Sequence, residues 1–358
     1  MPRTTVNSAD SHVFEPDDLW QKNLPAAVRE RGPRTEIVDE REVVYVDDRV
    51  VRRDPVAFMD AIRPPGSKDP KLRLADLDNQ GIWSELMFPS RALWVHLSED
   101  SYLQLACSRV YNDWLADEYM RFSPRFIGAA MLPTTDTADA VGELQRAVEM
   151  GYQTVFLPTA TPPGRDYNLE DWKPLWAAAA EAGISLSFHI GTGMDPKVYR
   201  GPGGAITNHV VSFYGAQTTL CHLVASGVLE DHPGLHISFV ESGGSWLPAV
   251  MERMDEAQRQ YGTFFLRPKL PMLPSEYVKR QVHISFQHGR AVLSTLDVTG
   301  IDPIMWGSDY PHLEGTFPNT QKELDSIFEG VDDDVRAAIT GGNFTKLFQV
   351  PELDSPGR

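Results

Sequence analysis

The chain has 358 residues, of which 42% are hydrophobic and 23% charged, as in ordinary soluble globular enzymes. Its net charge of −17 argues against a surface that binds nucleic acid or an anionic membrane, because such a field repels phosphate. Two cysteines exclude a disulfide scaffold, and the sequence has neither an apolar signal core nor a membrane-spanning apolar run. We therefore expect a cytoplasmic protein with a small-molecule substrate and no nucleic-acid or membrane partner, and a homo-oligomer stays open.

A short segment near the N-terminus combines carboxylates with an imidazole. The segment from Thr4 to Phe14 is predicted as a strand, so Asp10 and His12 point to the same side of it. Such a pair can give one metal ion two short ligands, and Glu15 follows where the strand should open into a loop. The alternative is a surface loop or a buried core histidine, because short motifs of this kind recur by chance.

The next segment, residues 17–75, is rich in Arg, Pro, Asp and Glu. Within it, residues 42–51 predict a small hairpin that turns at Asp47 and Asp48. We interpret this segment as an insertion after the first strand, inside a single domain that spans residues 1–358.

From residue 72 onward, apolar β-rich runs alternate with helical patterns. This alternation predicts βαβ units and a parallel sheet, and with the first strand there are eight runs, which favours a closed (β/α)8 barrel over an open sheet. Glycines at 151, 183 and 227 fall near the ends of three predicted helices, where a left-handed cap is favourable. The runs after the first are 82–88, 125–132, 154–157, 185–190, 236–240, 282–286 and 303–306, and the helical patterns include 72–80, 102–122, 137–150, 172–182 and 217–229.

Chemically capable side chains gather just after five of the apolar runs. In a barrel of this kind the active site lies at the carboxyl ends of the strands, so these side chains are expected at one mouth. They are Asp10, His12 and Glu15 at the first strand, His189 at the fifth, Glu241 at the sixth, His288 at the seventh, and Asp309 and His312 at the eighth.

Two imidazoles and two carboxylates, from Asp10, His12, His189 and Asp309, form a donor set that suits zinc, iron or manganese. Glu15 and Glu241 would give one ion too many carboxylates, which favours two ions without excluding one. The alternatives stay open: a core histidine at 189, a turn aspartate at 309 and a helix cap at 241.

His288 and His312 follow the seventh and eighth strands. They are candidates for substrate contacts or general acids, with a surface loop as the alternative in each case. We group both with Asp309 as the candidate catalytic residues.

Five motifs resemble the amidohydrolase-related family of the amidohydrolase superfamily, over nearly the whole chain. They are DSHVFEP at 10–16, LADLDNQGI at 74–82, FHIG at 188–191, LEDHPGLHISFVESGGSWLP at 229–248 and WGSDYPH at 306–312. The resemblance implies a distorted (β/α)8 barrel. It also implies metal ligands at Asp10, His12, His189 and Asp309, the last of which also handles protons.

One departure from this family bears on the reaction. Its non-oxidative decarboxylases have a histidine before the glycines that follow strand six, where this chain has Glu241, and Glu15 adds a further carboxylate. The sequence therefore predicts a metal-dependent hydrolase of an ester, thioester, lactone or amide, such as a thioesterase, with a metal-activated water and one or two ions. The second hypothesis is a metal-dependent non-oxidative decarboxylase of an aromatic or related acid, and the third is a binding protein with a decayed site.

Overall fold

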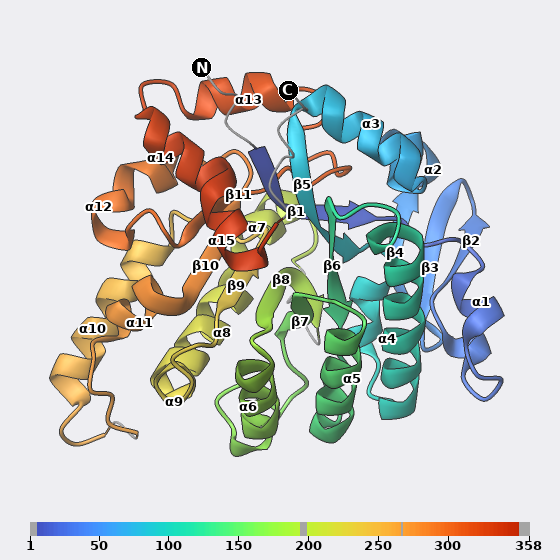
Figure 1. The fold of residues 1–358 in the computed structure, drawn as a ribbon. Coiled ribbons are helices and arrows are strands. Elements are labelled where there is room, and N and C mark those ends of the chain that lie inside the picture. Colours follow the sequence, from blue (N-terminus) through green and yellow to red (C-terminus); the bar gives the residue numbers. More distant parts are fainter. Residues whose placement is uncertain (1–5, 194–198, 266–267, 351–358) are drawn as a thin grey trace.

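The computed structural model describes residues 6–193, 199–265 and 268–350, and a parallel eight-stranded sheet forms its centre. The strands lie inside a ring of helices (Figure 1) and follow the order β1-β5-β6-β7-β8-β9-β10-β11. Their inner and outer faces are both covered, which is why most of them are continuous runs of buried residues. Their bounds are β1 Val6–Val13, β5 Ile82–Pro89, β6 Phe126–Met131, β7 Thr154–Ala160, β8 Ser185–Gly193, β9 Ile237–Val240, β10 Val282–Phe286 and β11 Ile304–Trp306.

The helices pack on the sheet through one apolar side. In α5, for example, Ala140, Leu144 and Ala147 are buried at helical spacing, and Asp136 caps the first turn by accepting bonds from two backbone amides. Among the described residues no helix has the length and apolarity needed to cross a bilayer. The helices are α1 Leu19–Asn23, α2 Val56–Ala61, α3 Pro70–Gln80, α4 Ser101–Leu115, α5 Thr137–Glu149, α6 Lys173–Ala182, α7 Gly204–Val211, α8 Tyr214–Ala225, α9 Val228–Asp231, α10 Leu247–Tyr261, α11 Pro274–Gln281, α12 Leu296–Thr299, α13 Thr320–Ile327, α14 Asp333–Ala337 and α15 Asn343–Phe348.

The barrel closes through the segment that follows β11. The backbone N–H of Asp309 donates to the carbonyl of Asp10 at 2.9 Å, and the N–H of His12 donates to the carbonyl of Tyr310 at 2.6 Å. The hydroxyls of Ser8 and Ser308 add a contact of 2.9 Å across the same seam. The structure thereby confirms the predicted α/β barrel, and three of the candidate ligands, Asp10, His12 and Asp309, lie at the seam between its first and last strands.

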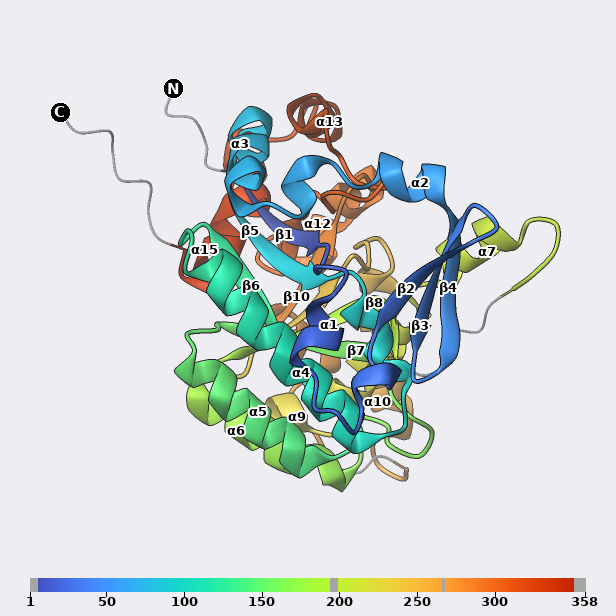
Figure 2. The same cartoon turned by 90° about the vertical axis from the view of Figure 1, so that its right-hand side faces the viewer.

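A small antiparallel sheet stands beside the barrel, and α2 leads from it across to α3 (Figure 2). It contains the predicted hairpin, which turns at Asp47 and Asp48, both in the left-handed region with φ of 53° and 59°. A third strand pairs with the hairpin and was not predicted, since it alternates weakly and is mostly exposed. The strands are β2 Arg34–Val38, β3 Arg41–Val46 and β4 Arg49–Pro55. The assignment of residues 1–358 to one domain stays a prediction.

The predicted barrel strands all occur, and the differences lie at helix ends. The predicted helix 217–229 is divided, because Gly227 has a φ of 87° and stops α8 before α9 begins. The predicted helix 102–122 ends its regular part at Leu115 and continues as one wide turn over Ala116–Met120. Gly151 and Gly183 adopt the expected left-handed conformation, with φ of 91° and 65°.

The seam provides the first test, at Gly307. A Cβ there would meet the Cβ of Asp10 at 2.6 Å, and neither atom belongs to a flexible side-chain end. We expect Gly307→Ala to lower the free energy of unfolding by about 1–3 kcal/mol, the usual cost of overpacking, as measured by urea unfolding.

Gly142 in α5 is the matched control, because a Cβ there has no neighbour within 4 Å. Gly142→Ala should leave stability unchanged or raise it, since alanine favours a helix interior. Equal stability of wild type and Gly307→Ala would contradict the close approach at the seam.

Candidate metal centre

Six of the predicted site residues meet at one mouth of the barrel. Asp10 and His12 come from β1 and His189 from β8, while Glu241 follows β9, and Asp309 and His312 follow β11. Their ligand atoms form overlapping groups, each with atoms within 4.8 Å of one another. In a parallel barrel, functional side chains lie at the carboxyl ends of the strands. This arrangement places side by side residues that are up to 299 positions apart in the sequence, from 10 to 309.

The spacing of these atoms suits coordination of a common ion. The Nε2 atom of His12 lies 3.7 Å from Asp10 Oδ1 and 3.6 Å from Asp309 Oδ1. The Nε2 atom of His189 lies 3.6 Å from Asp10 Oδ1 and 3.5 Å from Glu241 Oε2. Adjacent ligands of an ion with bonds of about 2.0–2.2 Å lie about 3–3.5 Å apart, so a small contraction would complete the shell.

Both histidines are oriented by backbone carbonyls. The Nδ1 atom of His12 lies 2.8 Å from the carbonyl of Pro89, and that of His189 lies 2.9 Å from the carbonyl of Ile190. A carbonyl only accepts, so each Nδ1 carries the proton and each Nε2 keeps a free lone pair. Carbonyl contacts of this kind commonly orient metal-binding histidines.

Four buried atoms at this centre have no hydrogen-bond partner in the described part of the chain. They are Asp10 Oδ1, His12 Nε2, His189 Nε2 and Asp309 Oδ2. Unpaired buried polar atoms are costly, and four that converge call for a common partner. Two imidazole nitrogens and carboxylate oxygens are the donor set of a divalent transition metal, so the residues fit such an ion.

The electrostatics of the centre also call for a cation. Burial, together with the nearby Asp309, raises the pKa of Glu241 well above its usual value, and burial with Asp10 does the same for the pKa of Asp309. Burial, with the neighbouring His312 and His189, lowers the pKa of His12. A divalent ion would reverse the cost of clustering these carboxylates.

Two of the acidic residues are held in an uncommon backbone conformation. Glu241 and Asp309 have φ of 58° and 52°, in the left-handed region that favours glycine. Residues held in sparsely populated conformations concentrate at functional sites. The helix-cap alternative for Glu241 does not apply, because its carboxylate faces His189 and the following helix starts only at Leu247.

The structure separates the two candidate catalytic histidines. His312 lies at the centre, with Nδ1 2.9 Å from Asp309 Oδ1 and its ring stacked on His12 at 4.2 Å. His288 is 47% exposed and lies 2.8 Å from the carbonyl of Glu314 through Nε2. The geometry thus supports His312 as a reacting group and gives no support to His288.

Glu15 is the predicted ligand that the structure does not bring to the others. Its carboxylate is fully buried and accepts the backbone N–H groups of Arg91 and Ala92, each at 2.9 Å. The position of Glu15 in the loop after the first strand does not indicate where its side chain points, because the two amides belong to a segment 76 residues away.

Gln287 follows the seventh barrel strand next to His288, and the sequence analysis gave it no role in the site. Its side-chain amide donates to Asp10 Oδ2 at 3.0 Å, which leaves Oδ1 directed at the centre. Its place immediately after β10 was the available signal.

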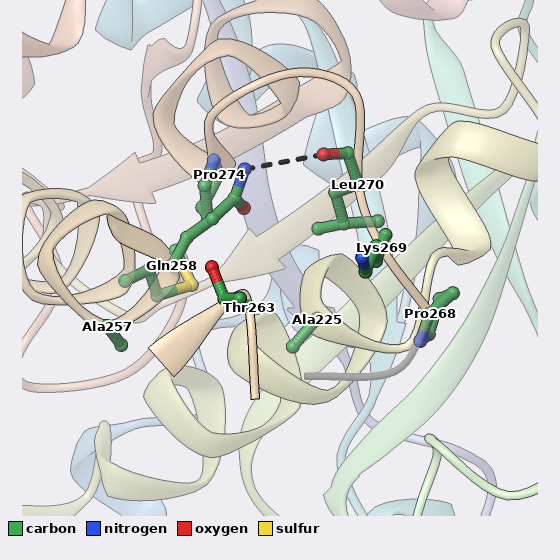
Figure 3. A pocket seen from close by; sticks show the side chains of 10 residues that line it. Ala225, Ala257, Gln258, Thr263, Pro268, Lys269, Leu270 and Pro274 are labelled. Carbon is green, nitrogen blue, oxygen red and sulfur yellow. Dashed lines mark hydrogen bonds between the residues drawn. The ribbon is translucent and has the colours of Figure 1, made fainter. Parts of the chain in front are cut away.

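A pocket of about 340 Å³ lies elsewhere, outside the barrel (Figure 3). It is lined by Ala225 at the end of α8, by Gln258 of α10, and by the segment before α11 that includes Leu270. None of the candidate ligands lines it, so it plays no part in the chemistry of the metal centre.

We expect His189→Ala to empty the centre, because it removes one of two neutral nitrogen ligands from a site rich in carboxylates. Metal analysis after dialysis should find a divalent ion in the wild type and almost none in the variant. His232→Ala, which removes an imidazole near the end of α9, is the control and should keep the metal. Full metal content in His189→Ala would contradict the assignment.

Comparisons with known proteins agree with this architecture. The sequence model of the amidohydrolase family matches residues 36–350. An amidohydrolase of Mycobacterium avium subsp. paratuberculosis K-10 has a similar structure, with a TM-score of 0.81, 22% identity, and coverage of 97% of this chain and 100% of that one. These findings confirm the family resemblance and the barrel fold.

Several relatives carry the names of decarboxylases. The γ-resorcylate decarboxylase of Rhizobium sp. (strain MTP-10005) is 26% identical over 260 residues, which are 68% of this chain and 76% of that protein. A dihydroxybenzoic acid decarboxylase of Polaromonas sp. JS666, solved with bound manganese, has a TM-score of 0.68 and 17% identity, over 99% of this chain and 100% of that one.

These relatives contradict the primary functional prediction. Hydrolysis of an ester, thioester, lactone or amide rested on Glu241, where the decarboxylases have histidine, and on the added Glu15, and the relatives named as decarboxylases overturn that prediction. The decarboxylase alternative is the better supported of the two. The donor set of the centre suits a divalent metal. Because the family match extends over most of its length, the chain belongs to the amidohydrolase family and is an enzyme of the amidohydrolase superfamily.

Proposed function

We propose that the protein is a metal-dependent, non-oxidative decarboxylase of a small hydroxy-substituted aromatic acid. The observation that carries the proposal is the buried cluster of unpaired ligand atoms from Asp10, His12, His189 and Asp309, in a chain whose relatives include γ-resorcylate and dihydroxybenzoic acid decarboxylases. A bound divalent ion would supply the positive charge that attracts and orients an anionic acid. Manganese is the ion proposed, because that decarboxylase structure contains it.

The proposed reaction exchanges carbon dioxide for a proton at one ring carbon. The bond between the ring and the carboxylate breaks, carbon dioxide leaves, and the electron pair on the ring carbon takes up a proton. The protein must therefore hold a proton close to the bound acid, without an oxidant or a reductant.

Asp309 and His312 are the groups that we assign to this proton transfer. Asp309 is fully buried, while His312 is 16% exposed, so the pair connects the interior of the mouth with solvent. The 2.9 Å contact between His312 Nδ1 and Asp309 Oδ1 allows a proton taken up by the imidazole to reach the buried carboxylate. The ring of His12 stacked beneath His312 fixes the orientation of that imidazole.

The test of the function is release of carbon dioxide from γ-resorcylate and other hydroxybenzoates by the manganese-loaded protein. His312→Gln should keep the metal and lower kcat by about 10²–10⁴-fold, the usual contribution of a proton-transferring group. His288→Gln removes an exposed imidazole at the same end of the barrel and should leave kcat unchanged. Product formed by the wild type in D₂O should carry one deuterium at the former carboxylate position.

The proposal fails if no hydroxybenzoate releases carbon dioxide from a protein that contains its metal. It would lose its proton route if the two histidine variants had equal turnover.

The number of ions is a separate part of the proposal, and we propose one. Each two of the three groups of ligand atoms share one residue, either Asp10, His12 or Asp309, and this overlap favours a single ion between them. Glu15, which was expected to serve a second ion, has both oxygens engaged by backbone amides.

Metal analysis of wild type and Glu241→Gln checks the ion count. With one ion, both proteins should contain about one manganese per chain, because two imidazoles and two aspartates remain. Two ions in the wild type and one in the variant would restore a dinuclear centre with Glu241 as a ligand of the second ion.

A further inference from the structure

Glu15 ties the end of β1 to the end of β5. Its carboxylate receives the backbone N–H groups of Arg91 and Ala92, while the Arg91 side chain donates back to the Glu15 carbonyl at 2.9 Å and to Asp17 at 2.6 Å. Glu15 is fully buried and Arg91 is 5% exposed. The two segments therefore form a closed clamp of reciprocal bonds.

The clamp lies directly beside the carbonyl that orients His12. β5 ends at Pro89, two residues before Arg91, and the Pro89 carbonyl lies 2.8 Å from His12 Nδ1. Any shift of the turn after β5 would move this carbonyl. His12 would then lose the bond that keeps the proton on Nδ1 and the lone pair on Nε2.

We propose that Glu15 is a positioning residue that keeps His12 in its metal-binding tautomer by fixing the Pro89 carbonyl. This inference rests on the metal centre of the proposed function, in which His12 is a ligand through Nε2. Glu15 itself does not contact the ion. Its buried carboxylate acts on the metal only through the turn after β5 and the imidazole.

A buried glutamate at this position supports a role in positioning the turn after β5. Burial raises the pKa of Glu15, and the hydrogen bonds from the backbone amides of Arg91 and Ala92 act against this shift. If the backbone N–H groups of this turn needed only a hydrogen-bond acceptor, water at the surface could provide it. Here both carboxylate oxygens are used on two consecutive backbone amides, which fixes the direction of the chain as well as its position.

The experiment measures the ring tautomer and the metal affinity separately. In the metal-free wild type, ¹⁵N chemical shifts of the His12 ring should report a protonated Nδ1 and an unprotonated Nε2. In Glu15→Ala, we expect a mixture of both tautomers and a manganese dissociation constant about 10–100-fold higher, as for other contacts that orient ligands. Glu15→Gln keeps one acceptor oxygen and should show a smaller change in both.

Glu143→Ala is the matched control. Glu143 is a buried carboxylate of α5 that accepts bonds from Asn112 and Arg146, away from the metal centre. Its loss should reduce stability to a comparable degree, and the His12 tautomer and the manganese affinity should stay as in the wild type.

Three outcomes would overturn the inference. An unchanged His12 tautomer in a folded Glu15→Ala protein would show that the clamp does not act on the imidazole. Equal losses of affinity in Glu15→Ala and Glu143→Ala would reduce Glu15 to a stabilising residue. Loss of one of two bound ions with the tautomer intact would make Glu15 a ligand. The tautomer is read without metal, so this part stands or falls separately from decarboxylation.

Discussion

Closure of the barrel is the constraint on which the rest of the structure depends. The two backbone bonds that join the first strand to the segment after the last involve Asp10, His12, Asp309 and Tyr310. Three of these residues are also candidate metal ligands. A shift of one residue along this seam would therefore break the barrel and, at the same time, move the ligands apart. The stability of the fold and the geometry of the centre therefore cannot vary independently. Gly307 permits the close approach, because no side chain stands between it and Asp10.

Around this seam, a second group of side chains holds the ligands in place. Arg73 of α3 pairs with Glu85 of β5 in full burial, donates to the His12 carbonyl at 2.7 Å and lies over the Tyr310 ring. A buried ion pair is weak support for stability on its own, since desolvation offsets the attraction. Its third contact is more informative: the guanidinium joins β1, β5 and the closing segment at one point. Together with the carbonyls that orient the two imidazoles, the guanidinium restricts the positions that the ligand atoms can adopt.

The sequence was sufficient for those parts of the site that depend on strand periodicity. Asp10 and His12 share a strand face, and His189 and Asp309 follow at strand ends, so the barrel rule predicted that these residues meet, and the structure brings their ligand atoms together. It could not distinguish Glu15 from Glu241, because both are glutamates just beyond a strand. Glu241 points toward the centre because its backbone adopts a left-handed conformation. Glu15 points away, to backbone amides 76 residues later in the chain, a contact that the sequence does not indicate. The third strand of the small sheet was missed because little of it is buried.

The reaction type was beyond what ligand chemistry alone decides. A divalent ion held by two imidazoles and carboxylates can activate a water for hydrolysis or attract the carboxylate of an acid, and the same residues serve both. The hydrolase prediction depended on counting carboxylates, and that count included Glu15. Because the Glu15 carboxylate binds the backbone amides of the neighbouring turn, the centre has one carboxylate fewer, and the excess of negative charge that favoured a second ion is smaller. Glu241 then stands 3.5 Å from His189, beside the same position that the other donors face. The proposed decarboxylation needs a proton delivered to the substrate carbon, and the contact between Asp309 and His312 is the feature of this centre that we assign to that task.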